Sequence, residues 1–211
     1  MVPSLQDLCM RVLLENVDAI TSIEKIARWL AEEQLSLSLK ECDMSNLMVL
    51  QLDQCGRCLP DYIMYSSLAR GANSLPALSS VSITAACRLF DSGLKALVSS
   101  APNIRSINLS QCSLLTSAAI QTLANTLGAV LKELYLGDCH RFDIMVARPA
   151  FKKLEQLEVL PLAAAKSVND DFIGVILATQ GPILKELILD DCTYVNYFII
   201  RLLRVFEGTF L

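Results

Sequence analysis

Apolar residues recur along the chain in one sequence motif, L-x-x-L-x-L-x-x-C, in which the positions marked x are mostly polar. Segments that fit it begin at Leu47, Leu78, Ile104, Leu131, Leu157 and Leu184. The intervals between these starts are 31, 26, 27, 26 and 27 residues. A period of this length is typical of stacked repeats, in which each unit buries its apolar side against the next. The alternation within L-x-L predicts a short strand in every unit.

Two of the six units are irregular. In the unit that begins at Leu78, Cys87 comes one residue late, and in the unit that begins at Leu157, Ala165 takes the cysteine place. That second unit also has Pro161 in the middle of its predicted strand and follows a predicted helix that contains Pro149. Proline cannot donate a hydrogen bond to a sheet, so we expect a local break there.

The second half of each unit predicts a helix. Soon after the cysteine place come an apolar residue and a small polar one: Phe90-Asp91, Leu115-Thr116, Phe142-Asp143, Val168-Asn169 and Val195-Asn196. Asp, Thr and Asn accept hydrogen bonds from the free N–H groups at a helix start, so these polar residues are predicted caps. The residues that follow have helical spacing, for example Ile120, Leu123 and Leu127.

A strand, a bend and a helix in each unit predict an α/β solenoid. The strands would form a parallel sheet on the concave face, the helices would form the convex face, and the leucines would fill the core between them. The cysteine would lie where the chain bends from strand to helix, a place that suits a small, buried, weakly polar side chain. A catalytic or metal-binding use of these thiols is disfavoured because the spacing puts successive cysteines in separate units.

Composition narrows the class of protein. Of the 211 residues, 53% are apolar and 19% are charged, as in folded domains rather than disordered chains. No secretory signal or membrane-spanning stretch is recognised, so the eight cysteines are expected to be reduced thiols in a nuclear or cytoplasmic protein. A net charge of −4 disfavours direct binding to nucleic acid, which needs clustered Lys and Arg.

The two ends of the chain depart from the repeat. We divide the sequence into an N-terminal helical cap or remnant of a preceding repeat, 1–27, and a repeat domain, 28–211. Ahead of Trp29 the segment "AITSIEKIARWL" does not fit the strand motif L-x-x-L-x-L, so the first unit is expected to lack its strand. The last unit ends in "LLRVFEGTFL" without a polar capping unit, which favours contact with a partner, another copy or a further segment.

The stretches "SNLMVLQLDQCGRC" and "LVSSAPNIRSINLSQCSLLTSAAIQTLANTLGAVLKELYLGDC" resemble the cysteine-containing family of leucine-rich repeats. This family is found in F-box proteins and in the antagonist of the mitotic exit network. The amino-acid sequence of the repeats is most similar to plant-type relatives of the radiation-sensitivity repeat factor of nucleotide excision repair. The resemblance covers roughly residues 28–205. It implies about six repeats of 26–27 residues and a recognition role, often as substrate receptor of a cullin-type ubiquitin ligase. No F-box is recognised, so another chain would supply the ligase contact.

The sequence offers little for catalysis, and we expect neither an enzyme nor a cofactor. His140 follows Cys139, but adjacent residues at a bend usually point apart, whereas a catalytic pair must be within hydrogen-bond reach. Cys55 and Cys58 form a C-x-x-C pair, which elsewhere indicates redox or zinc chemistry, yet no second pair has ligand spacing. A thiol or zinc module at Cys55 and Cys58 is the least favoured hypothesis.

The concave face is the predicted partner-binding site. Side chains between and just after the inward leucines would project from it, and the candidates are Gln51, Asp53, Ser82, Thr84, Asn108, Ser110, Glu133, Tyr135, Ile188 and Asp190. The first rows are small and polar, whereas later rows bring aromatic and apolar side chains that anchor protein partners. The aspartates make a basic protein segment a better partner than nucleic acid. The alternative is a free-standing scaffold or inhibitor that binds an unrelated protein with the same face.

Overall fold

The computed structural model describes residues 22–23, 43–53 and 60–196. They form a seven-stranded sheet in which all neighbours are parallel and the strand order equals the chain order. The strands are β1 Ser22–Ile23, β2 Val49–Gln51, β3 Ser80–Ser82, β4 Ser106–Asn108, β5 Glu133–Tyr135, β6 Val159–Pro161 and β7 Glu186–Ile188. Parallel pairing of the leucine segments, predicted from the repeat, is confirmed.

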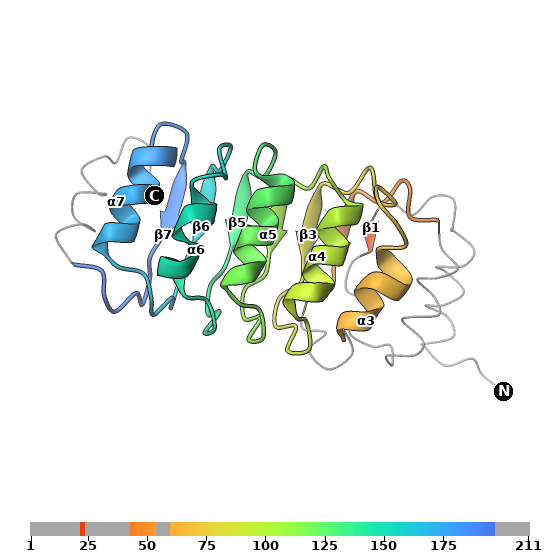
Figure 1. Ribbon diagram of the computed structural model, residues 1–211, viewed down its shortest axis with the longest axis horizontal. Helices are drawn as coiled ribbons and strands as arrows, with labels where there is room; N and C mark the ends of the chain where they lie inside the picture. The colour runs from red at the N-terminus through yellow and green to blue at the C-terminus, as the bar shows by residue number, and fades with distance from the viewer. Residues whose placement is uncertain (1–21, 24–42, 54–59, 197–211) are drawn as a thin grey trace.

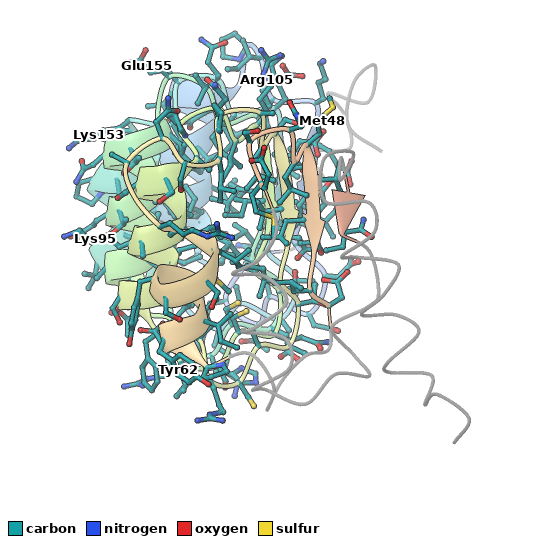
Figure 2. All side chains as sticks on the ribbon, turned by 90° about the vertical axis from the view of Figure 1, so that its right-hand side faces the viewer. Met48, Tyr62, Lys95, Arg105, Lys153 and Glu155 are labelled. Atoms are coloured by element: carbon teal, nitrogen blue, oxygen red, sulfur yellow. The ribbon has the colours of Figure 1, made fainter. Side chains whose placement is uncertain are left out.

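The helices cover one side of this sheet. They are α3 Asp61–Ile63, continued by the π-helical turn η3 Met64–Leu68, then α4 Asp91–Ser100, α5 Ser117–Leu127, α6 Ile144–Phe151 and α7 Asp170–Gln180. Figure 1 shows them side by side in front of the strands, in chain order. In the side view of Figure 2, Lys95 and Lys153 project from the helix layer, away from the sheet. Within the described part of the chain, the helices are too short or too polar to cross a membrane.

The leucines of the repeat motif form the core between the sheet and the helices. Numbering each unit from its first leucine, positions 1, 4 and 6 face the helices, and in the unit of β4 these are Ile104, Ile107 and Leu109, all fully buried. Ile120 and Leu123 of α5 are buried in the same core cluster from the helix side. Adjacent strands pair in register, for example Ile107 with Leu134, so each position lies beside the same position of the next unit.

The cysteine at position 9 is buried at the bend in three described units. Cys112, Cys139 and Cys192 are at most 7% exposed. Each thiol donates to a position-6 carbonyl of the preceding unit: Cys112 to Ile83 at 3.0 Å and Cys139 to Leu109 at 3.1 Å. The thiols thus tie successive units together, as expected of a structural row. Alanine holds position 9 in the units of β3 and β6, as buried Ala86 and Ala165, and the late Cys87 is exposed.

Three of the predicted helix caps are confirmed. The side chains of Thr116, Asp143 and Asn169 precede α5, α6 and α7 and accept hydrogen bonds from backbone N–H groups of the first turn. The prediction for Asp91 is wrong, because Phe90 holds the cap position and Asp91 is already helical. The buried apolar residue of that unit is Leu89, one residue earlier than in the pairing that the sequence suggested.

Two expectations about irregular segments change. The unit expected to lack its strand has one: Ser22–Ile23 pairs in parallel with β2, with Ile23 opposite Leu50. Pro161 does not interrupt the sheet. The pairing of β5 with β6 is limited to Glu133 with Val159, but the Pro161 carbonyl accepts from the Leu136 N–H at 3.1 Å. The boundary predicted between residues 27 and 28 lies outside the described residues.

Candidate recognition surface

The face of the sheet that looks away from the helices carries all ten predicted site residues. We call it the open face and define it by positions 3, 5 and 7 of the six units that begin at Leu47. Besides the ten candidates, its members are Val49, Ser80, Ser106, Gly137, Val159, Pro161, Ala163 and Glu186. Pro161 is buried and Asp190 is exposed, whereas the others are half-buried between their neighbours. In-register strands bring equal positions side by side, so the predicted set forms one surface.

The N-terminal part of the open face is a fixed polar network. One carboxylate oxygen of Asp53 accepts from Ser82 Oγ at 2.6 Å, from Thr84 Oγ1 at 2.9 Å and from the Thr84 backbone N–H at 3.0 Å. Asn108 accepts from the Ser110 backbone N–H at 3.0 Å. Side chains held by several hydrogen bonds lose little further freedom on binding, so this part of the surface is preorganised.

The middle of the open face combines a carboxylate with an aromatic ring. Glu133 accepts from Ser106 Oγ of the preceding strand at 2.7 Å and from the Tyr135 hydroxyl at a long 3.5 Å. Burial raises the pKa of Tyr135, and the nearby carboxylates Glu133 and Glu186 raise it further. The phenol therefore keeps its proton at neutral pH and remains a hydrogen-bond donor.

Toward its C-terminal end the open face becomes apolar. Val159, Pro161 and Ile188 lie there on β6 and β7, with Ile188 directly beside Pro161 in the register. Across all eighteen positions the surface carries four carboxylates and no Lys, Arg or His. The sequence predicted this acidic character and its aromatic and apolar end, but not the hydrogen bonds that hold the polar side chains.

Cys139 and His140, considered as a catalytic pair, have different surroundings. The Cys139 thiol points into the core, where burial raises its pKa to about 11. His140 is exposed and its Nε2 lies 3.3 Å from a carboxylate oxygen of Asp138. Burial likewise raises the pKa of Cys112 to about 12, so these thiols are poor nucleophiles at neutral pH. Cys55 and Cys58 lie outside the described residues, within which no cluster of His, Cys, Asp or Glu could hold a metal ion.

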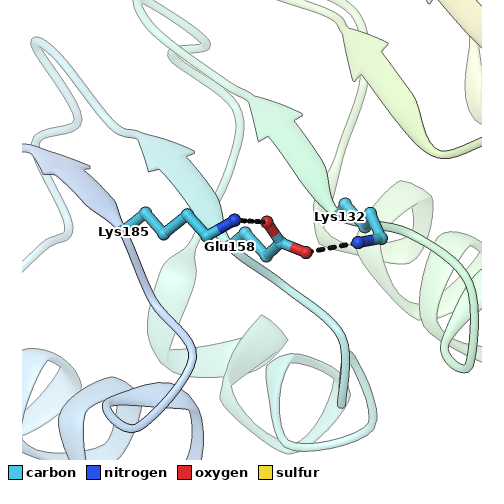
Figure 3. A network of polar contacts seen from close by, with 3 residues as sticks. All are labelled: Lys132, Glu158 and Lys185. Atoms are coloured by element: carbon cyan, nitrogen blue, oxygen red, sulfur yellow. Dashed lines mark hydrogen bonds and ion pairs between the residues drawn. The ribbon is translucent and has the colours of Figure 1, made fainter.

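An ion-pair row at position 2 was missed by the sequence analysis. Glu158 accepts from Lys132 and from Lys185, each at 2.5 Å, and so links three successive units (Figure 3). These two hydrogen bonds lower the pKa of Glu158 to about 2. The signal was present in the repeat, because "LKEL", "LEVL" and "LKEL" place Lys, Glu and Lys at the same position of consecutive units.

No protein-family model matches the chain, and no curated protein matches it. Among solved structures it is similar to a chain of the yeast Rad7 and Elc1 complex, with a TM-score of 0.64 and 20% identity over 80% of this chain and 41% of that one. It is also similar to the tropomodulin C-terminal domain of Caenorhabditis elegans, with a TM-score of 0.52 and 18% identity, over 84% of this chain and 100% of that one.

At these identities the likeness shows the fold alone, which is leucine-rich-repeat-like. The chain spans 41% of the length of the Rad7–Elc1 chain that it matches.

Proposed function

We propose that the chain is a leucine-rich-repeat solenoid that acts as a non-catalytic recognition module and binds a protein partner on its open face. The observation that carries this proposal is the composition of that face. It joins a preorganised polar region around Asp53 to an aromatic and apolar region around Tyr135 and Ile188. Protein interfaces combine aromatic and apolar anchors with a polar surround in this way.

The more specific form of the proposal is a substrate receptor or scaffold of the DNA-repair or ubiquitin-ligase type, nuclear or cytoplasmic in location. Two observations support it: the resemblance of the repeats to the cysteine-containing family, and the likeness to a chain crystallised as a complex, that of Rad7 with Elc1. A cullin-type ligase component or a repair factor would be contributed by another chain.

Affinity capture from nuclear extract tests both forms. The bait is the full chain, and Tyr135→Ala should reduce capture because it removes the ring at the centre of the open face. The matched control is Tyr65→Ala, since Tyr65 is 53% exposed and lies on η3 in the helix layer. Thermal melts of both variants would establish that they are folded.

The identity of the captured proteins separates the alternatives. Ligase or repair components that depend on Tyr135 support the specific form. An unrelated partner that depends on Tyr135 favours a free-standing scaffold or inhibitor instead. Equal capture of a partner by the unaltered chain and by Tyr135→Ala would overturn the assignment of the open face. Zinc analysis and thiol titration of the purified chain test the third hypothesis, a thiol or zinc module at Cys55 and Cys58.

A further inference from the structure

Two carboxylates flank one apolar side chain on the open face. Glu133 of β5, Val159 of β6 and Glu186 of β7 are direct neighbours in the register. Because parallel strands lie about 4.8 Å apart, the backbones of the two glutamates are roughly 10 Å from each other. Side chains of this length can both reach a group placed above Val159.

An aromatic ring stands beside these carboxylates. Tyr135 lies two residues after Glu133 on the same strand, so the two side chains share a face of the sheet. Both Glu133 and Glu186 contribute to the raised pKa of Tyr135, which places both carboxylates within electrostatic reach of the ring. Pro161 and Ile188 occupy the same repeat position as Tyr135 on the next two strands, so the open face is apolar beside the ring.

The negative charge of this region is not neutralised within the described part of the chain. Neither Glu133 nor Glu186 forms an ion pair there, and no position of the open face carries Lys or Arg. The lysines that precede these glutamates in the chain, Lys132 and Lys185, both form ion pairs with Glu158. A partner that brings a positive charge would therefore complement the region, whereas phosphate groups would be repelled.

We propose that the open face over β5 to β7 binds an arginine-bearing segment of a partner protein, with the guanidinium between Glu133 and Glu186 and against the ring of Tyr135. Apolar side chains next to the arginine would lie on Pro161 and Ile188. Arginine fits better than lysine because its planar group offers five donors, which can serve two carboxylates while it stacks on an aromatic face. This inference rests on the proposed function and specifies the chemistry of the partner.

The test uses a fluorescein-labelled peptide of three leucine–arginine repeats and its neutral analogue with citrulline in place of arginine. Fluorescence anisotropy at low salt should show binding of the arginine peptide and at least roughly fivefold weaker binding of the citrulline peptide. The variant E133Q/E186Q should bind the arginine peptide roughly five- to tenfold more weakly. The control E155Q/D171N removes two exposed carboxylates outside the open face and should change the affinity less than about twofold.

Equal binding of the two peptides, or equal effects of the two double variants, would overturn the inference. The peptide comparison uses the unaltered chain and therefore holds even if a variant folds poorly. Affinity capture separates this inference from the proposed function. If capture still depends on Tyr135 while the arginine peptide shows no preference, the arginine site is wrong and the recognition role stands. If capture is also independent of Tyr135, both are wrong.

Discussion

At the scale of single residues, the bend after each strand is made by a left-handed backbone at position 8. The residues concerned are Ala85, Gln111, Asp138, Ala164 and Asp191, with φ between 56° and 63°. The backbone N–H of each of the first four residues donates to the position-7 carbonyl of the next unit, at 2.7 to 3.0 Å. Such a backbone costs a non-glycine residue roughly 1–2 kcal/mol, so the hydrogen bond between units offsets local strain.

Replacing Ala165 by cysteine should stabilise the protein. Ala165 lines a small apolar cavity of about 10 Å³ together with Leu136, Cys139 and Phe151. A thiol there would fill the cavity and, by analogy with the other units, donate to the Leu136 carbonyl. We expect Ala165→Cys to raise the free energy of unfolding by about 1 kcal/mol, measured by urea denaturation.

Cys139→Ala is the matched control for that substitution. It removes a buried thiol that donates to Leu109 and should lower the free energy of unfolding by about 1 kcal/mol. A loss of stability in Ala165→Cys would show that the cavity cannot accept the sulfur.

The buried thiols also predict a stability that falls at alkaline pH. An unfolded thiol titrates at about 8.5, whereas the pKa values in the folded protein are raised to about 12 for Cys112 and about 11 for Cys139. Their contribution is complete below pH 8.5 and is lost as the pH rises toward 11 to 12. The melting temperature should therefore fall over this range, and fall less in Cys112→Ala. Parallel curves for the two proteins would contradict this prediction.

At the scale of elements, helix starts are connected between neighbouring units. Asp61 of α3 accepts from the backbone N–H of Phe90 at 3.0 Å and of Gly93 at 2.8 Å, and so caps α4 in place of the missing local side chain. Asp91 of α4 accepts from the backbone N–H and Oγ1 of Thr116, the residue that caps α5. The starts of α4 and α5 thus contact carboxylates of the preceding helix, whereas the Asp143 N–H ahead of α6 donates to the Ser117 hydroxyl of α5.

Removing the Asp61 carboxylate should weaken this connection. Asp61→Ala is expected to lower the free energy of unfolding by about 1–2 kcal/mol, the usual effect of losing a helix cap. The control is Asp171→Ala, an exposed acidic residue in the first turn of α7, with an expected change of about 0.5 kcal/mol or less. Equal losses in the two variants, measured by chemical denaturation, would show that the cap of α4 does not depend on α3.

The elements differ in how far the repeat predicted them. Strand and helix positions followed from period and apolar spacing, because stacked units must present the same residues to one core. The capping of α4 did not follow, because its donor and acceptor are 29 residues apart in the chain and a local pattern shows only Asp91. Strand β1 was missed because "AITSIEKIARWL" lacks the motif L-x-x-L-x-L, although Ile23 is paired in register with Leu50.

At the scale of the whole molecule, the in-register sheet turns a sequence period into a surface. The predicted members of the open face lie together because position 5 of one unit, such as Ser82, is the neighbour of position 5 in the next, Asn108. Hydrogen bonds between side chains of different units, such as that from Ser106 to Glu133, depend on side-chain conformation and could not be predicted from spacing. The continuity of the sheet across Pro161 extends this surface to β7.

The most direct test of the account is site-specific photo-crosslinking in cells, with benzoylphenylalanine placed on each side of the molecule. Asn108 and Ile188 represent the open face, and the exposed residues Ser99 and Gln121 represent the helix layer. The account predicts a protein adduct from the first pair and none from the second. Adducts confined to Ser99 and Gln121 would contradict recognition through the open face.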